Sequence, residues 1–227
     1  MIAPVRSYYA RGFTLVELLT VIAIIGTLAA LSIPIIGKVR RSANQAKATT
    51  NIHQLVIAHL TYAADNKGVF PPKYLSGVYP SWQDPIAPYV GLKIANPGQL
   101  YVLRQDPDSI FNVPDSLPYD ERATSATSIA RNYNLREGNW NYMVNAVQTP
   151  ARTILLGECE VQNLDELGGL RADGVTSVAS NVAKPGFRRN GGTAALMGFV
   201  DGHVTAISRE SLRGDISVAE GNLWRWW

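Results

Sequence analysis

The longest apolar stretch of the chain covers residues 13–36, and Glu17 is its single charged residue. At 1.5 Å per residue, a helix of about 24 residues reaches roughly 36 Å, which exceeds the hydrocarbon core of a bilayer at about 30 Å. The pattern therefore predicts a membrane-spanning helix. Pro34 lacks a backbone N–H, so we expect a helix kink or a loosened turn around Ala30.

The apolar pattern changes but does not end after residue 36. Residues 37–67 are mostly polar, with apolar positions recurring every three or four residues. These positions are Val39, Ala43, Ala46, Ile52, Leu55, Val56, His59, Leu60 and Ala63. Such spacing predicts an amphipathic helix that continues the first one. Gly68 is a plausible C-cap, and Pro71 and Pro72 prevent further helix.

The remaining residues, 68–227, predict a globular head of short strands and long loops. Residues 68–145 show little periodicity, and only Ile86–Val90 and Gln99–Leu103 are short regular candidates. Scattered tyrosines and tryptophans indicate that this region packs by its aromatic side chains. Residues 150–210 predict a small antiparallel sheet.

Three runs in that last region read as strands, at residues 153–157, 194–200 and 204–208. Asp201 and Gly202 separate the second run from the third, and Asp-Gly between β-rich runs is a strong hairpin signal. The fold class predicted for the whole chain is therefore α+β, with a long N-terminal helix packed on a small antiparallel sheet.

Composition agrees with one anchored globular domain. The chain has 227 residues, of which 46% are hydrophobic and 17% charged. The formal net charge is +3, with two positive charges in the first 12 residues, so no nucleic-acid partner is indicated. Cys159 is the single cysteine, which excludes an intrachain disulfide.

Glu17 is the residue of the apolar stretch that is energetically most costly to place in a membrane, because a carboxylate there needs a partner. No cation lies in the same stretch. We therefore expect its partner to come from another chain, from a newly freed amino terminus or from the membrane interface.

The junction Gly12-Phe13-Thr14-Leu15-Val16-Glu17 resembles the N-terminal signal of type IV prepilins and of type II secretion pseudopilins. The resemblance implies that residues 1–12 form a cleaved leader peptide. It implies cleavage between Gly12 and Phe13 by the prepilin peptidase and methyltransferase, and N-methylation of Phe13. It further implies that Glu17 serves subunit assembly.

The same resemblance implies a structural filament subunit and not an enzyme. The other expected partners are copies of the chain, related pilins, the assembly platform of the bacterial inner membrane and membrane lipid. The head would lie in the periplasm or at the cell surface. Pilus and pseudopilus remain open at this point, as do major and minor subunits.

The C-terminal part resembles a segment of certain prepilin-type proteins, written His-x9-Asp-Gly. Residues 188–192 and 198–204 carry that resemblance. Arg189 and Asn190 stand where the leading histidine is expected, so this segment is a divergent one. Any role of that histidine is in doubt here.

Candidate chemistry is sparse. His53 and His59 lie on different sides of the predicted helix, and His203 follows the hairpin turn. No serine or cysteine lies in a nucleophile motif, and the sequence around Cys159 is interpreted as the end of a strand. No cofactor or metal ligand is assigned. Calcium is kept as a hypothesis without assigned ligands, because the acidic residues lack the spacing of a calcium loop.

Other interpretations stay open. A cleavable secretory signal has a shorter apolar region, and a plain signal anchor does not explain Gly12-Phe13 with Glu17. Four cations follow the apolar stretch, Lys38, Arg40, Arg41 and Lys47, and a charge count alone would place the head in the cytoplasm. A membrane-tethered binding module is the alternative function. The tryptophan-rich C-terminus, 224–227, is expected to fold back on the head.

Overall fold

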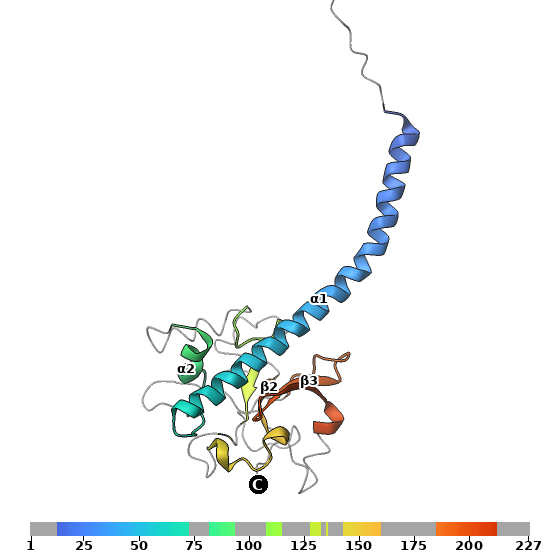
Figure 1. Ribbon diagram of the computed structural model, residues 1–227. Helices are drawn as coiled ribbons and strands as arrows, with labels where there is room; N and C mark the ends of the chain where they lie inside the picture. The colour runs from blue at the N-terminus through green and yellow to red at the C-terminus, as the bar shows by residue number, and fades with distance from the viewer. Residues whose placement is uncertain are drawn as a thin grey trace, which may run out of the picture. The chain divides into compact units, whose positions relative to one another are not determined.

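The computed structural model describes residues 13–72, 82–93, 108–114, 128–132, 135, 143–159 and 185–212. Within them, a long helix comes first, short helical segments and one strand follow, and three more strands complete a sheet (Figure 1). The α+β class predicted from the sequence is confirmed. The chain divides into two compact units, residues 1–43 and residues 44–227.

Helix α1 spans Leu15–Asp65 and contains Pro34. It ends where the sequence predicts. The Gly68 N–H donates to the Ala63 carbonyl at 2.7 Å, and Lys67 and Gly68 adopt positive φ angles of 58° and 81°. Glycine adopts this conformation without a steric penalty, so Gly68 closes the helix as a C-terminal cap.

The sheet has four antiparallel strands in the order β1-β2-β3-β4. The strands are β1 (Ile129–Arg131), β2 (Ile154–Glu158), β3 (Ala194–Phe199) and β4 (Val204–Ser208). The predicted hairpin is confirmed, with Gly198 opposite Val204 and Ala194 opposite Ser208. Strand β3 ends one residue earlier than expected, because the hairpin turn begins at Phe199, whose carbonyl accepts from the Gly202 N–H at 3.0 Å.

Strand β1 was not expected, since it has only three residues and lies in the stretch without periodicity. All three are buried, and β1 pairs with β2 from Ile129 opposite Glu158 to Arg131 opposite Leu156. A strand this short carries almost no alternation for sequence reasoning to detect. Its place is set by pairing with β2, which is a long-range contact.

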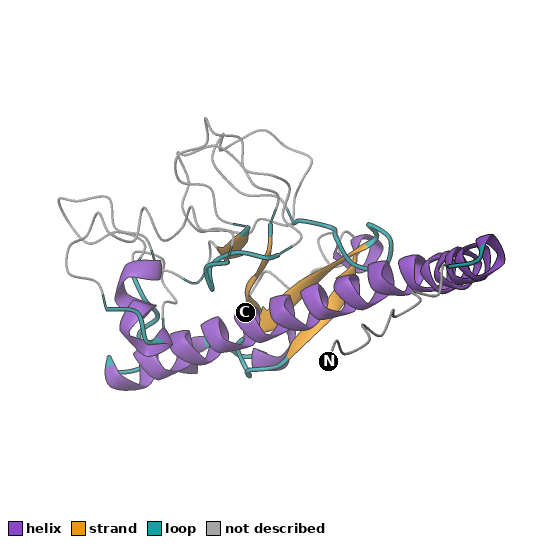
Figure 2. Cartoon of the chain, turned by 90° about the horizontal axis from the view of Figure 1, so that it is seen from above, coloured by secondary structure: helices purple, strands orange, loops and turns teal. Residues whose placement is uncertain are grey.

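The core of the head forms where the second half of α1 lies along the sheet (Figure 2). Ile52, Leu55 and Val56 of the helix are fully buried with Leu155, Leu156 and Leu196 of the strands. Gly198 permits this close approach. A Cβ atom there would lie 2.5 Å from Val56 Cγ2 and 3.0 Å from Ile52 Cγ2, closer than real Cβ atoms pack.

Burial on α1 begins later than the apolar spacing suggested. Val39, Ala43 and Ala46 are exposed, and the first buried residue of the helix is Ala48. The expected stripe is therefore correct only from residue 48 onward. Spacing defines which face of a helix is apolar, but not how far along that face the head extends.

The aromatic region contains two short helical segments, α2 (Gln83–Ile86) and η1 (Ala87–Val90), which agree with the regular stretch predicted at residues 86–90. Trp82 is buried in the core, with its ring 6.0 Å from Phe111 and 4.9 Å from His59. This contact supports aromatic packing. Two further 3-10 segments, η2 (Val144–Ala146) and η3 (Pro150–Arg152), lead into β2. Residues 99–103 lie outside the described part.

Candidate functional site

The start of α1 is fixed by a reciprocal contact between Thr14 and Glu17. The Thr14 N–H and hydroxyl each donate to Glu17 Oε2 at 2.8 Å, and the Glu17 N–H donates to Thr14 Oγ1 at 3.3 Å. This is a capping box, in which a threonine and a glutamate three residues later satisfy backbone donors at a helix start. Thr14 is thus a hydrogen-bond partner of Glu17 that the sequence analysis missed, and the expected pairing of Glu17 with a cation stays a prediction.

The capping box leaves Glu17 with spare acceptor capacity. Both hydrogen bonds reach Oε2, and Oε1 accepts none from the described residues. Hydrogen bonds from an amide and a hydroxyl also leave the negative charge in place. Glu17 is exposed on the helix, so its carboxylate is accessible to a cation from outside the chain. The sequence signal Thr-x-x-Glu was present and could have revealed the cap.

The other polar side chains of the apolar segment are satisfied internally. The hydroxyls of Thr20, Thr27 and Ser32 donate to backbone carbonyls one turn earlier, at 2.9, 2.8 and 2.7 Å. A bilayer offers no water to polar groups, so such bonding suits a helix in lipid. By length and composition, α1 is the one described helix that could cross a membrane.

The apolar segment is exposed along its whole described length. Every residue from 13 to 43 is exposed, including Phe13 at 75% and Ile33 at 71%. Soluble proteins rarely expose a continuous apolar surface of this size, and such surfaces contact lipid or other protein. Pro34 lies inside α1, which continues on both sides of it. Gly12 lies outside the described residues.

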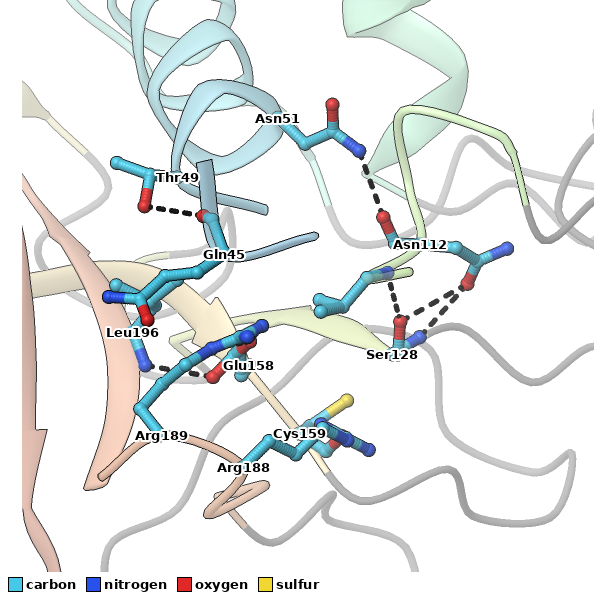
Figure 3. A network of polar contacts seen from close by, with 11 residues as sticks. Gln45, Thr49, Asn51, Asn112, Ser128, Glu158, Cys159, Arg188, Arg189 and Leu196 are labelled. Carbon is cyan, nitrogen blue, oxygen red and sulfur yellow. Dashed lines mark hydrogen bonds and ion pairs between the residues drawn. The ribbon is translucent and has the colours of Figure 1, made fainter. Parts of the chain in front are cut away.

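A second polar network lies in the head, at the segment with the divergent motif (Figure 3). Arg189 forms an ion pair with Glu158, and both side chains are buried, at 3% and 0% exposed. Arg189 Nε also donates to Glu158 Oε1 at 3.0 Å, and the Leu196 N–H donates to Glu158 Oε2 at 3.0 Å. The residue in place of the expected histidine thus anchors the turn before β3 to the end of β2.

The neighbouring contacts extend this anchoring. Arg188 Nη2 donates to the Cys159 carbonyl at 2.9 Å, and Cys159 is buried just after β2, as the strand-end interpretation predicted. On the other side, Asn51 of α1 donates to the Asn112 carbonyl at 2.9 Å. The Asn112 side chain accepts from the Ser128 N–H at 3.1 Å. These contacts hold the chain together and offer no arrangement for catalysis.

The three histidines occupy separate environments. His53 is exposed, whereas His59 is fully buried and its Nδ1–H donates to the Leu55 carbonyl at 2.7 Å. Burial, and then the charge of Arg131, lowers the pKa of His59 to about 3, so the ring is neutral. His203 stacks on Phe199 with ring centroids 4.1 Å apart and contacts Asp201 at 2.6 Å. The structure therefore brings none of them together.

Acidic groups in the described part do not form a metal site. Asp108 is paired with Lys47 at 2.5 Å, which lowers the pKa of the Asp108 carboxyl through a hydrogen bond and the lysine charge. Asp201 is paired with His203. Asp106, Asp165, Glu166 and Asp173 lie outside the described residues, as does the tryptophan-rich C-terminus. The calcium hypothesis stays a prediction.

Comparison with known proteins identifies the first of these two sites. Residues 8–33 match the prokaryotic N-terminal methylation motif, which confirms the prepilin-type signal. The chain is also 44% identical over 55 residues to the type IV major pilin protein PilA of Myxococcus xanthus strain DK1622. That match covers 24% of the chain and 25% of the relative, so the chain spans about a quarter of the length of the curated relative it matches. No solved structure matches the chain.

Proposed function

We propose that this chain is a structural, pilin-type subunit of a membrane-anchored helical filament, in a type IV pilus or the related pseudopilus of type II secretion. One observation carries the proposal. A prepilin-type signal at residues 8–33 opens a helix whose residues 13–43 are all exposed. An uncovered apolar helix requires lipid before assembly and neighbouring helices afterwards.

Processing precedes assembly in this proposal. The prepilin peptidase cuts between Gly12 and Phe13, and the new amine of Phe13 is methylated. Before the cut, the chain is a single-pass protein of the bacterial inner membrane, with residues 13–36 in the bilayer. Its head lies in the periplasm and reaches the cell surface where the filament does. The assembly platform in the inner membrane then adds the subunit to copies of itself and related pilins.

Glu17 sets the axial position of each subunit in the proposed mechanism. The capping box holds one carboxylate oxygen, and the other is left for a cation. The positive amine of Phe13 on a neighbouring copy is the group that the cut supplies. In a medium of low dielectric constant an unpaired charge is heavily penalised, so subunits pair where the two charges meet. Apolar contacts alone would permit the helices to slide.

Two substitutions at one position separate the charge from the cap. Glu17→Gln keeps a side-chain oxygen that can accept from Thr14, since glutamine also forms capping boxes, but it removes the charge. Glu17→Ala removes both. We expect both variants to be cut after Gly12 and neither to form filaments. Asp65→Asn removes the acid at the other end of α1 and should assemble normally. The measurement is filament yield by electron microscopy, beside the mass of the membrane-bound subunit.

The outcomes separate the pairing from the broader function. Abundant normal filaments from Glu17→Gln would exclude charge pairing while leaving a filament subunit in place. An unprocessed wild-type chain that never polymerises, and a head that binds a small ligand saturably, would instead support the tethered binding module.

A further inference from the structure

Three cations follow the apolar segment of α1, and together we call them the basic collar: Lys38, Arg40 and Arg41. They come directly after Gly37, at the end of the apolar segment where the polar part of the helix begins. A helix turns about 100° per residue, so Arg40 lies about 200° and Arg41 about 300° around the axis from Lys38. The three cations therefore lie within an arc of about 160°, on one side of the helix.

These charges are not neutralised by their own helix. The acidic residues of α1 are Glu17 and Asp65, far from the collar along the axis, so no carboxylate lies three or four residues away. All three side chains are exposed, and none forms an ion pair with a described residue. Lys47 differs, because Asp108 of the head contacts it at 2.5 Å. The next cation along the helix is thus paired with an acid, whereas the collar has no such pair among the described residues.

The position of the collar along the helix indicates what it contacts. If residues 13–36 fill the hydrocarbon core, Lys38 emerges about 37 Å along the helix from Phe13, within the headgroup layer that begins beyond about 30 Å. Lysine and arginine reach phosphate groups at that level with their long side chains. A headgroup layer at that level meets all three cations, whichever side of the helix they occupy.

We propose that the basic collar binds the headgroups of anionic phospholipids in the leaflet on the side of the head, and that this contact fixes the depth of the unassembled subunit. The inference rests on the proposed membrane span of residues 13–36. It also accounts for cations on the side of the span where the statistics of membrane proteins disfavour them. After export, headgroup contacts oppose sliding of the helix in either direction.

The test measures which lipids the inserted protein holds. The full chain is reconstituted in phosphatidylcholine vesicles that contain a trace of spin-labelled phosphatidylglycerol or spin-labelled phosphatidylcholine. Electron spin resonance then gives the fraction of each label that the protein immobilises. Each surface cation favours an anionic leaflet by about five-fold, so we expect phosphatidylglycerol to be preferred by roughly two- to five-fold at low salt. Screening by salt should reduce the preference.

A triple variant, Lys38→Gln with Arg40→Gln and Arg41→Gln, should show a clearly weaker preference for phosphatidylglycerol than the wild type. Lys47→Gln is the matched control, because it removes a cation of the same helix that Asp108 already occupies, and it should keep the wild-type preference. Arg6 and Arg11 are present in every variant, so they do not affect the comparison.

Three results would overturn the proposal, and they differ in what they leave standing. Equal immobilisation of both labels by the wild type would reject the collar as a lipid site while keeping the span. Unchanged selectivity in the triple variant, with loss of filaments, would assign the collar to contacts between copies. No immobilised label of either kind would reject the membrane span and the collar with it.

Discussion

The two halves of helix α1 are buried in different ways. From residue 48 onward, one face of the helix is covered by the chain's own sheet, and Ile52, Leu55 and Val56 are fully buried there. From residue 13 to residue 43 every residue is exposed, although this half is the more apolar one. One continuous helix thus has an apolar face that is buried in its second half and an apolar surface that is exposed in its first half.

The difference assigns a separate role to each half. The second half contributes to folding of the head, because its apolar surface is removed from water within a single chain. The first half must remove its surface from water through lipid or through other subunits. Substitutions in the head should therefore change its unfolding, whereas those in the first half should change membrane insertion or assembly and leave the head intact.

The largest expected effect concerns the buried ion pair of the head. Arg189→Met removes the cation and leaves the Glu158 carboxylate buried without it, which should lower the free energy of unfolding by about 3–5 kcal/mol. Tryptophan fluorescence during urea unfolding of the detergent-solubilised chain measures this change. Membrane extraction should be unaffected, because the pair lies far from the apolar segment in sequence.

A second variant tests the cause of that loss. Glu158→Gln combined with Arg189→Met keeps an acceptor for the Leu196 N–H and removes both charges, so it should recover part of the stability. If the double variant is as unstable as Arg189→Met alone, an unpaired buried charge is not the reason for the loss.

Two glycines provide the next comparison: Gly198 of β3, against which the second half of α1 packs, and Gly26 within the first half of α1. Gly198→Ala places a Cβ atom 2.5 Å from Val56 Cγ2, so the helix must shift and the head should lose about 1–3 kcal/mol of stability. Gly26→Ala meets no atom within 4 Å and should leave unfolding of the head unchanged. The same urea measurement applies to both. Equal effects of the two substitutions would contradict the division of α1 into these roles.

The smallest expected effect is a pH dependence of the head. The pKa of His59 is about 3 in the folded chain and near its ordinary value of 6.5 in the unfolded chain, so below pH 6.5 the unfolded state binds more protons. Stability should be fully present above pH 6.5 and should fall by up to about 1.4 kcal/mol per pH unit below it. His59→Leu should flatten this slope between pH 6.5 and 5. Substitution of the exposed His53 by Asn should not.

Features that depend on neighbouring residues were predictable from the sequence. The hairpin follows from Asp201-Gly202 between two β-rich runs, and the end of α1 follows from Gly68 before two prolines. The capping box of Thr14 and Glu17 is equally local, and its signal was present but not used.

Features that depend on contacts distant in sequence were not predictable. Glu158 and Arg189 are separated by 31 positions, and no local pattern indicates that a buried carboxylate meets this arginine in place of a histidine. The same holds for the close packing at Gly198 of β3, where the absence of a side chain leaves room for Ile52 and Val56 of α1. Pairing of this kind is decided by the whole fold and leaves little trace in hydrophobic spacing.

The intact mass of the protein extracted from native membranes tests the central claim most directly. The account requires the first half of α1 to enter a filament with a free, methylated amine at Phe13. It therefore predicts a mass lower by residues 1–12 and higher by a single methyl group. Recovery of the chain with those residues still attached, as a soluble or solitary membrane protein, would contradict it.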